Sequence, residues 1–410
     1  MNKLPAFKYR DFRYLWVAST CAQIALWTLL LGNAQAVYQL SDKSSAWVGV
    51  STFASMSPFL IAPIGGVISD RFERRAVALA SRSATLVVVA ALLFLALAGL
   101  MEVWMVISLA LLQGLVRSVQ MPADQALIAN VVPATERGNA IALQSMTQHG
   151  TRAVGPLIVL LLSPGYEGAY AVGAVFSVIS VVAILPMELR SRGGVARMGA
   201  FVKNISEGIS YVKATPPVLA VFVLIFAHCA LTMSFDSMLP GFAEDNLHSE
   251  THGFLIMSIG VGIGALVGTF MLAIFSDASR GVLFLGSAVL SGLSPILMAT
   301  ATTVPMAANA AVLMGMSQGM MMALASIIIQ DVVPDEVRGR VMSLNAMSAG
   351  GIMAMANLGF GSLADRIGAP TLFLIPALAF LAIVALTLLI GGHYRRIYRT
   401  GHARIAPAAA

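Results

Sequence analysis

Charge is what this sequence has least of. Only 11% of the 410 residues are Asp, Glu, Lys or Arg, whereas soluble domains carry about 25%. The hydrophobic residues make up 58% of the chain, so it has too little polar surface to cover a water-soluble globule. This shortage excludes an ordinary soluble enzyme or binding domain and indicates a chain that lies mostly in lipid.

Cysteines and clusters of metal-binding residues are scarce as well. The two cysteines, Cys21 and Cys229, both fall within apolar stretches, and we interpret them as small packing residues rather than a disulfide framework. The sequence shows no nucleotide-binding loop, no metal-ligand spacing and no nucleophile arrangement. We therefore expect no enzyme activity, no cofactor and no metal. We also expect no cleavable signal peptide before the first apolar stretch.

Long apolar runs recur along the whole chain instead. A run of about 20 apolar residues is enough to cross the hydrocarbon core as a helix. We predict twelve such spans, at 14–38, 46–69, 76–100, 102–129, 139–163, 168–189, 217–242, 253–276, 281–302, 305–330, 340–363 and 370–391. The sequence therefore predicts an all-α polytopic membrane protein with 12 transmembrane helices.

The basic residues are distributed unevenly between the two sides of this membrane. With the N-terminus inside, the predicted cytoplasmic segments hold 21 of the 25 Lys and Arg residues, with Arg82 counted among them. This asymmetry is the positive-inside pattern. It places both termini in the cytoplasm and explains the net charge of +6 by topology and attraction to membrane lipids, so we expect no nucleic-acid binding.

The two halves of the chain resemble each other. Residues 131–138 (VVPATERG) return as 332–339 (VVPDEVRG), each time between a fourth and a fifth span. Six spans, a linker and six similar spans form the duplicated architecture of secondary transporters, whose site lies at the membrane midplane between the halves. We predict an N-terminal six-helix bundle at 1–189, a cytoplasmic linker at 190–216, a C-terminal bundle at 217–392 and a basic tail at 393–410.

The predicted linker carries its own amphipathic pattern. Phe201, Ile205, Ile209 and Val212 recur at helical spacing and share one face. This pattern predicts a short helix lying in the cytoplasmic interface. The alternative is a solvated linker.

The loop between the second and third spans has the spacing Gly-x-x-x-Asp-Arg-x-x-Arg-Arg, from Gly66 and Asp70 to Arg71, Arg74 and Arg75. It resembles the corresponding loop of major facilitator superfamily transporters. The resemblance covers essentially the whole chain and is nearest to bacterial exporters of the drug and siderophore type, including enterobactin exporters. It implies the major facilitator fold, two pseudo-symmetric six-helix bundles that work by alternating access.

In that family the loop latches the two halves on the cytoplasmic side. The resemblance implies that Gly66 permits close helix approach and that Asp70 faces the positive N-terminal end of the eleventh span. Arg74 would pair with Asp70 and with Asp124, near the inner end of the fourth span. One departure is that Glu73 replaces the family's usual glycine. The alternative is that the arginines only anchor the loop on the cytoplasmic side.

The fifth span contains Gly150, Gly155 and Pro156 in the spacing Gly-x-x-x-x-Gly-Pro. This resembles the antiporter signature of exporters in the superfamily. The small residues favour close helix packing and the proline favours a bend. The resemblance therefore implies export, although glycine and proline are common in any membrane helix.

Among the ionisable residues inside predicted spans, four are our candidates for coupling and for the cavity: Arg117, Arg152, Asp236 and His228. A charge at the centre of a bilayer costs ~2.5–3.5 kcal/mol on insertion scales, so we expect the arginines to line a cavity and act on nearby acids. The alternative is a structural salt bridge. Asp236 is our candidate for the proton-binding carboxylate. The alternative is that Asp236 is a hydrated residue at the periplasmic mouth with no role in coupling. His228, two turns away, is either a proton relay or a packed neutral donor.

The remaining candidates belong to a substrate cavity. Gln23 and Asn33 in the first span offer neutral hydrogen bonds, and Trp27 and Phe235 offer apolar surface. We predict a monomeric, proton-coupled exporter of a small amphipathic molecule, a drug or a siderophore, in the bacterial cytoplasmic membrane. Two alternatives remain: an importer or lipid transporter on the same fold, and a non-transporting membrane sensor or scaffold.

Overall fold

The computed structural model describes residues 5–61, 65, 71–133, 135–188, 198–274, 280–390 and 392–400, and within these residues no strand is present. The first half of the chain forms a short 3-10 helix and six helical segments. They are η1 (Pro5–Lys8), α1 (Arg10–Leu40), α2 (Ser45–Met56) continued by the 3-10 turn η2 (Ser57–Ile61), α4 (Arg74–Leu97), α5 (Val103–Val131), α6 (Arg137–Leu162) and α7 (Tyr166–Ile184).

The second half repeats this succession of helices. After the linker helix α8 (Met198–Ala214) come α9 (Pro216–Leu231), α10 (Leu239–Asp245), α11 (Glu250–Ile274), α12 (Arg280–Ala299), α13 (Val304–Val332), α14 (Asp335–Ile367), α15 (Ala369–Ile390) and α16 (Gly392–Thr400). Each of the twelve predicted spans therefore overlaps one of these helices or a broken pair of them.

Among the described residues, fewer helices than the twelve predicted spans meet the length and composition that a membrane crossing requires. In the described part of the chain, nine helices are long and apolar enough to cross a membrane, or ten if the bent pair α8–α9 counts as one. The helices α2 and α6 do not qualify, because α2 is short and α6 carries many polar residues in its first half. The all-helical membrane fold is confirmed, whereas the count of twelve is not.

The predicted seventh span, 217–242, is wrong as a continuous helix. The helix α9 ends at Leu231 and α10 begins only at Leu239. Polar side chains replace the lost helical hydrogen bonds: Ser234 Oγ donates to the carbonyl of Cys229 at 2.6 Å, and the backbone N–H of Ser237 donates to Asn357 Oδ1 at 3.1 Å. Irregular backbone at membrane depth is tolerated when protein groups satisfy it in this way.

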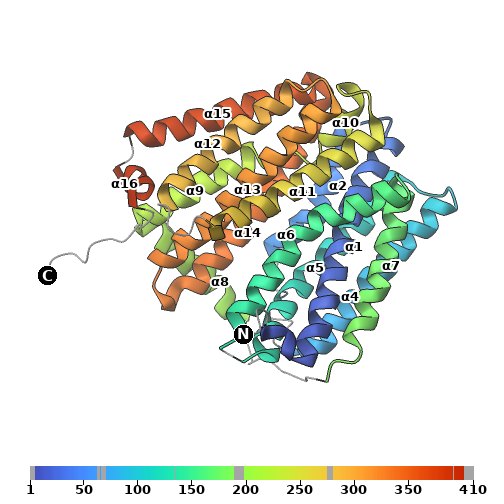
Figure 1. Ribbon diagram of the computed structural model, residues 1–410, viewed down its shortest axis with the longest axis horizontal. Helices are drawn as coiled ribbons and strands as arrows, with labels where there is room; N and C mark the ends of the chain where they lie inside the picture. The colour runs from blue at the N-terminus through green and yellow to red at the C-terminus, as the bar shows by residue number, and fades with distance from the viewer. Residues whose placement is uncertain are drawn as a thin grey trace.

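The two halves form two groups of helices that lie side by side (Figure 1), with α1–α7 coloured blue to green and α9–α15 yellow-green to red. They touch mainly through α2 against α14 and α6 against α11. Glycines allow this approach: a Cβ at Gly262 would lie 2.4 Å from the backbone nitrogen of Ala153, and one at Gly49 would lie 2.8 Å from the carbonyl of Asn357. Small residues at such contacts let helix backbones pack closely in a membrane.

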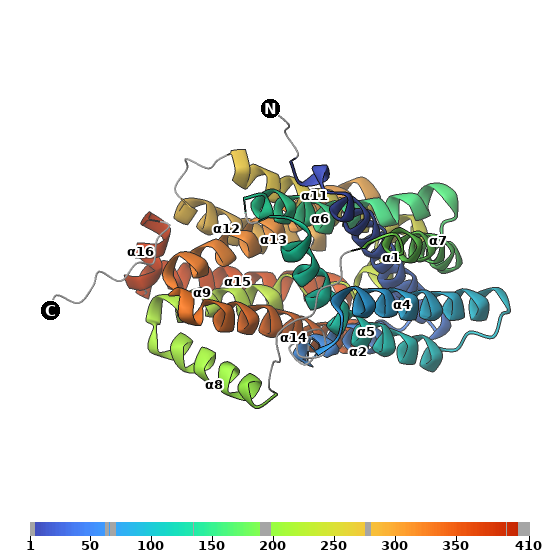
Figure 2. The same cartoon turned by 90° about the horizontal axis from the view of Figure 1, so that it is seen from below.

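The linker contains a helix, and it meets the second half. The helix α8 turns by 108° into α9 and lies beside α14 at the edge of the molecule (Figure 2). Val212 is buried, and Glu207 forms an ion pair with Arg340 of α14. The side chain of Phe201 lies outside the described part, so the predicted apolar face is only partly visible. Its location at the membrane surface stays a prediction.

Candidate functional site

The loop that resembles the cytoplasmic latch is only partly described. Gly66 and Asp70 lie outside the described residues, and Arg71 is exposed. Arg74 begins α4, directly after Glu73 in an extended conformation, and Arg75 Nη2 donates to the carbonyl of Leu185 at 2.7 Å. The latch therefore stays a prediction.

Asp124 has a partner that the sequence analysis did not foresee. Its carboxylate accepts hydrogen bonds from Arg82, Nη1 to Oδ1 at 2.9 Å and Nη2 to Oδ2 at 3.1 Å. We had expected Arg74 in this role and had counted Arg82 among the cytoplasmic charges. That count was wrong, because Arg82 lies two helical turns inside α4 and is only 2% exposed. A basic residue six positions into the span predicted at 76–100 was the signal available in the sequence.

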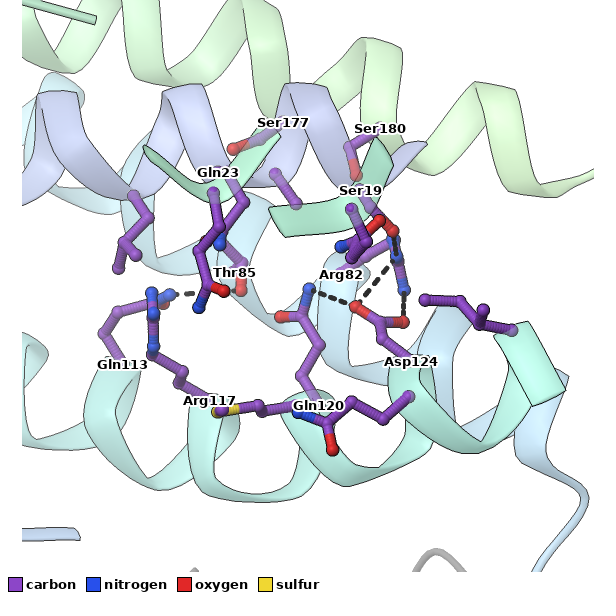
Figure 3. Close-up of a pocket in the computed structure, with 17 residues that line it drawn as sticks. Ser19, Gln23, Arg82, Thr85, Gln113, Arg117, Gln120, Asp124, Ser177 and Ser180 are labelled. Atoms are coloured by element: carbon purple, nitrogen blue, oxygen red, sulfur yellow. Dashed lines mark hydrogen bonds and ion pairs between the residues drawn. The ribbon is translucent and has the colours of Figure 1, made fainter. Parts of the chain in front are cut away.

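Around this pair the first half lines a partly open cavity, which we call the N-half cavity (Figure 3). Its wall comes from α1, α4, α5, α6 and α7 and is rich in amides and hydroxyls. The glutamines are Gln23, Gln113, Gln120, Gln125, Gln144 and Gln148, and the hydroxyls are those of Ser19, Thr85, Ser177 and Ser180.

Arg117 also lines the N-half cavity. Its guanidinium carbon stands 5.5 Å from the centre of the Phe59 ring, a cation–π distance. Because Arg82 and Asp124 neutralise each other, Arg117 contributes a positive charge beyond that pair. Arg117 and Gln23 line this same cavity, and their roles in coupling and in substrate contact stay predictions.

A second cavity lies between the two halves, and we call it the interface cavity. Its wall is mostly apolar and contains Trp27, Leu31 and Met56 from the first half and Phe235 and Met353 from the second. Trp27 and Phe235 therefore line the same cavity, and their role as substrate contacts stays a prediction. Such an apolar pocket with a few polar groups is typical of a small-molecule site.

The polar centre of the interface cavity is a pair of opposite charges. Arg152 Nη2 of α6 lies 3.9 Å from Asp236 Oδ1, in the break between α9 and α10. The same guanidinium donates to Gln318 Oε1 at 3.2 Å and stands 5.0 Å from the ring centre of Trp27. The pair joins the two halves of the chain. Arg117 and Arg152 thus line separate cavities rather than one.

The other candidates lie away from both cavities. His228 is fully buried, and its Nδ1 lies 2.8 Å from the hydroxyls of both Thr232 and Ser291. It belongs to a hydroxyl cluster inside the second half, and the helix break separates it from Asp236. Asn33 is buried in the first half, where its Oδ1 accepts a hydrogen bond from the Tyr170 hydroxyl at 3.1 Å.

The antiporter-like segment of α6 packs on α1 at Gly155 and on α11 at Ala153. A Cβ at Gly155 would lie 3.3 Å from Trp27 Cβ, whereas one at Gly150 would meet open space. Pro156 lines the interface cavity. The helix α6 continues through this proline to Leu162, so the predicted bend remains a prediction.

At one end of the molecule polar contacts join the halves directly, and we call them the clasp. Asp365, at the end of α14, accepts hydrogen bonds from the backbone N–H groups of Ser45 and Ala46 at 2.7 and 3.1 Å and from the Ser44 hydroxyl at 2.7 Å. Its carboxylate thus caps the N-terminus of α2. Beside it, Lys43 forms an ion pair with Glu244.

Several acids lie at or beside the clasp, and the surroundings shift the pKa values of Asp245 and Lys43. Burial, followed by the charge of the adjacent Glu244, raises the pKa of Asp245 above its ordinary value. The hydrogen bond to Glu244 raises the pKa of Lys43. On the predicted topology the clasp lies at the periplasmic end, because the loops between α1 and α2 and between α14 and α15 are external.

Comparison with known proteins agrees with this architecture. The profile of a family described as transmembrane secretion effectors matches residues 2–393. Macrolide efflux protein A of Streptococcus pyogenes is 22% identical over 390 residues, which cover 90% of this chain and 94% of that protein. The multidrug efflux pump Tap of Mycolicibacterium fortuitum is 25% identical over 207 residues, covering 49% and 50% of the two chains.

Solved structures share the fold as well. A crystal structure of the peptide transporter POT in complex with sulfate superposes with a TM-score of 0.78 at 12% identity, over 95% of this chain and 96% of that one. At this identity the similarity shows the arrangement of helices alone.

Proposed function

The chain belongs to the transmembrane secretion effector family of the major facilitator superfamily, and from this premise we propose that it exports a small amphipathic molecule, a drug or a siderophore, in exchange for protons. The protein is a multi-pass membrane transporter, and the names of its relatives support efflux. We place it in the bacterial cytoplasmic membrane with both termini inside, on the distribution of its basic residues, and we propose that it works as a monomer.

The observation that carries the proposal is the pair Arg152–Asp236 between the halves. The two charges lie 3.9 Å apart beside an apolar cavity. They attract only while Asp236 is ionised, because a neutral carboxyl loses the Coulomb attraction of the guanidinium. A proton on Asp236 therefore weakens a link between the two halves, which is the property that coupling requires.

The cycle follows from this link and the clasp. With the clasp closed and Asp236 ionised, the transporter faces the cytoplasm and takes up cargo there. Cargo in the interface cavity competes with Asp236 for Arg152, and the halves then open to the outside. Asp236 binds an external proton, the cargo leaves, and the proton is released inside after the return. The loop from Gly66 to Arg75 latches the cytoplasmic side in the outward-facing state.

The cavity supports an amphipathic cargo. Trp27, Phe235 and the methionines present apolar surface, and methionine adapts to ligands of different shape. Arg152, with Asp236, supplies the polar contact. A cargo with one polar group and an apolar body satisfies both parts of the wall.

The test is transport into everted membrane vesicles with an acidic interior. Radiolabelled macrolide and catecholate siderophore are offered in turn, and we expect one of them to accumulate until nigericin collapses the pH gradient. The Asp236→Asn variant should lose gradient-driven accumulation, and the control Glu167→Gln, an exposed acid at the start of α7, should keep it. Accumulation that survives nigericin contradicts proton exchange.

A further inference from the structure

The N-half cavity has a wall suited to a neutral, hydroxyl-rich ligand. It contains six glutamine amides and four hydroxyls. Each amide and each hydroxyl offers both donor and acceptor atoms, as the hydroxyls of a sugar do. Three of the hydroxyls already bond within the protein: Ser180 donates to the carbonyl of Ala18, and Ser19 and Thr85 accept from Arg82 and Gln113. The amides and the remaining hydroxyl are the groups that a ligand would use.

Three polar atoms in this wall are buried with no hydrogen-bond partner among the described residues: Gln113 Oε1, Ser177 Oγ and Arg82 Nε. Gln113 is 7% exposed; its Nε2 donates to Thr85 Oγ1 at 3.3 Å, but its Oε1 has no partner among the described residues. Ser177 is 2% exposed, and its hydroxyl has no partner there either. Both residues line the cavity (Figure 3). Buried polar atoms are costly when unpaired, so both side chains gain hydrogen bonds if they turn toward a ligand or water in the cavity.

The charges in the cavity leave room for a neutral ligand. Arg82 and Asp124 satisfy each other through two hydrogen bonds. Arg117 stands over the ring of Phe59 and gives the cavity a positive charge, which disfavours a cationic ligand. Guanidinium N–H groups donate readily to hydroxyl oxygens, so Arg117 suits a neutral sugar.

The two cavities adjoin along two helices. On α1, Gln23 lines the N-half cavity and Trp27, four residues on, lines the interface cavity. On α6, Gln148 and Arg152 repeat the same spacing between the same two cavities. Residues four apart on a helix are neighbours on one face, about 5–6 Å apart at Cβ. The walls of the two cavities therefore meet along α1 and α6, and an elongated molecule that fills both has to cross this boundary.

From this placement we propose that the cargo is a glycoside or a similar amphiphile, whose hydroxyl-rich part binds in the N-half cavity while its apolar part occupies the interface cavity. This deepens the proposed function by naming the chemical class of the cargo. All described walls of the N-half cavity belong to the first half, so the polar part stays bound to one rigid unit while the halves move.

The experiment measures equilibrium binding to the full chain in lipid nanodiscs, with no pH gradient. The probes are 4-nitrophenyl β-D-glucoside and 4-nitroanisole, which lacks the sugar. We expect the wild type to bind the glucoside more tightly. Gln113→Leu and Gln148→Leu should each weaken glucoside binding about fivefold, the value of one hydrogen bond, and leave 4-nitroanisole unchanged. The matched control is Gln330→Leu, at an exposed position near the inner end of α13.

Several outcomes would overturn the proposal. Equal binding of both probes by the wild type, or a sugar preference that survives both leucine variants, means that the cavity holds water only. Tighter binding of 4-nitrophenyl phosphate, lost in Arg117→Gln, makes it an anion site. A leucine variant that binds neither the glucoside nor 4-nitroanisole is misfolded, and the Ser177→Ala variant is then tested in its place. The binding experiment applies no pH gradient, so a negative result would overturn the glycoside proposal without bearing on proton-driven export. The vesicle assay tests proton-driven export separately.

Discussion

Removing the carboxylate of Asp365 should open the clasp. This carboxylate accepts three hydrogen bonds from the start of α2, two of them from backbone N–H groups. Hydrogen bonds to a charged group contribute about 1.5–3 kcal/mol each when shielded, and a carboxylate at a helix N-terminus adds about 0.3–1 kcal/mol. Because the site is open to solvent, we expect a total of about 2 kcal/mol. Since each 1.4 kcal/mol is tenfold, Asp365→Ala shifts the ratio of open to closed clasp about 30-fold.

The assay is thiol labelling of a single cysteine introduced at Ser258, in the interface cavity, in a background without Cys21 and Cys229. Opening of the clasp exposes this cysteine to an impermeant reagent added from the periplasmic side. Asp365→Asn keeps an acceptor oxygen without the charge and should give an intermediate labelling rate.

A matched control separates the clasp from general loss of charge. Asp331→Asn removes the ion pair with Arg280 at 2.7 Å, which lies entirely within the second half. Its labelling rate should equal that of the parent protein. If Asp365→Ala also labels at the parent rate, the clasp does not hold the halves together and the reasoning is refuted.

Three further predictions concern stability, each measured by thermal unfolding in detergent. Arg82→Leu should destabilise the protein by about 3–5 kcal/mol, because it leaves Asp124 unpaired in the bundle, and adding Asp124→Leu should restore most of the loss. Gly262→Ala should cost about 1–3 kcal/mol by overpacking against α6, whereas Gly286→Ala, where a Cβ meets open space, should have no such effect. Burial raises the pKa of Asp245, so its ionised form lowers stability as pH rises through that raised value; Asp245→Asn should be more stable than the wild type at pH 7 and equal to it below the ordinary Asp pKa.

The pairs of charges show where prediction from sequence reached its limit. Arg152 and Asp236 were both identified as intramembrane charges, since each is expensive in lipid and has to face a cavity or partner. Their contact depends on how α6 and the broken seventh span face each other. Arg82 was missed because its short distance from a basic loop made it look cytoplasmic, although its depth in α4 decides its role.

The broken seventh span is a second such case. Residues 217–242 contain an apolar run long enough to cross the membrane, and hydropathy alone predicts one helix. The break persists because Asn357 on α14 bonds the backbone of Ser237, a contact between residues 120 positions apart. Periodicity within one segment carries no information about that contact.

By itself the sequence determined the helical membrane fold and the duplication, because lipid obliges each spanning segment to satisfy its own backbone and so makes every span a long apolar run. It also identified Arg117, Arg152 and Asp236 as charges inside apolar spans. Only the tertiary structure decided which of these charges contact each other and that Arg117 and Arg152 line two separate cavities. It also decided that Asp365 of α14 bonds the N-terminus of α2 and so joins the two halves at one end. These depend on the rotation and contact of helices distant in the chain, which side-chain packing between them sets.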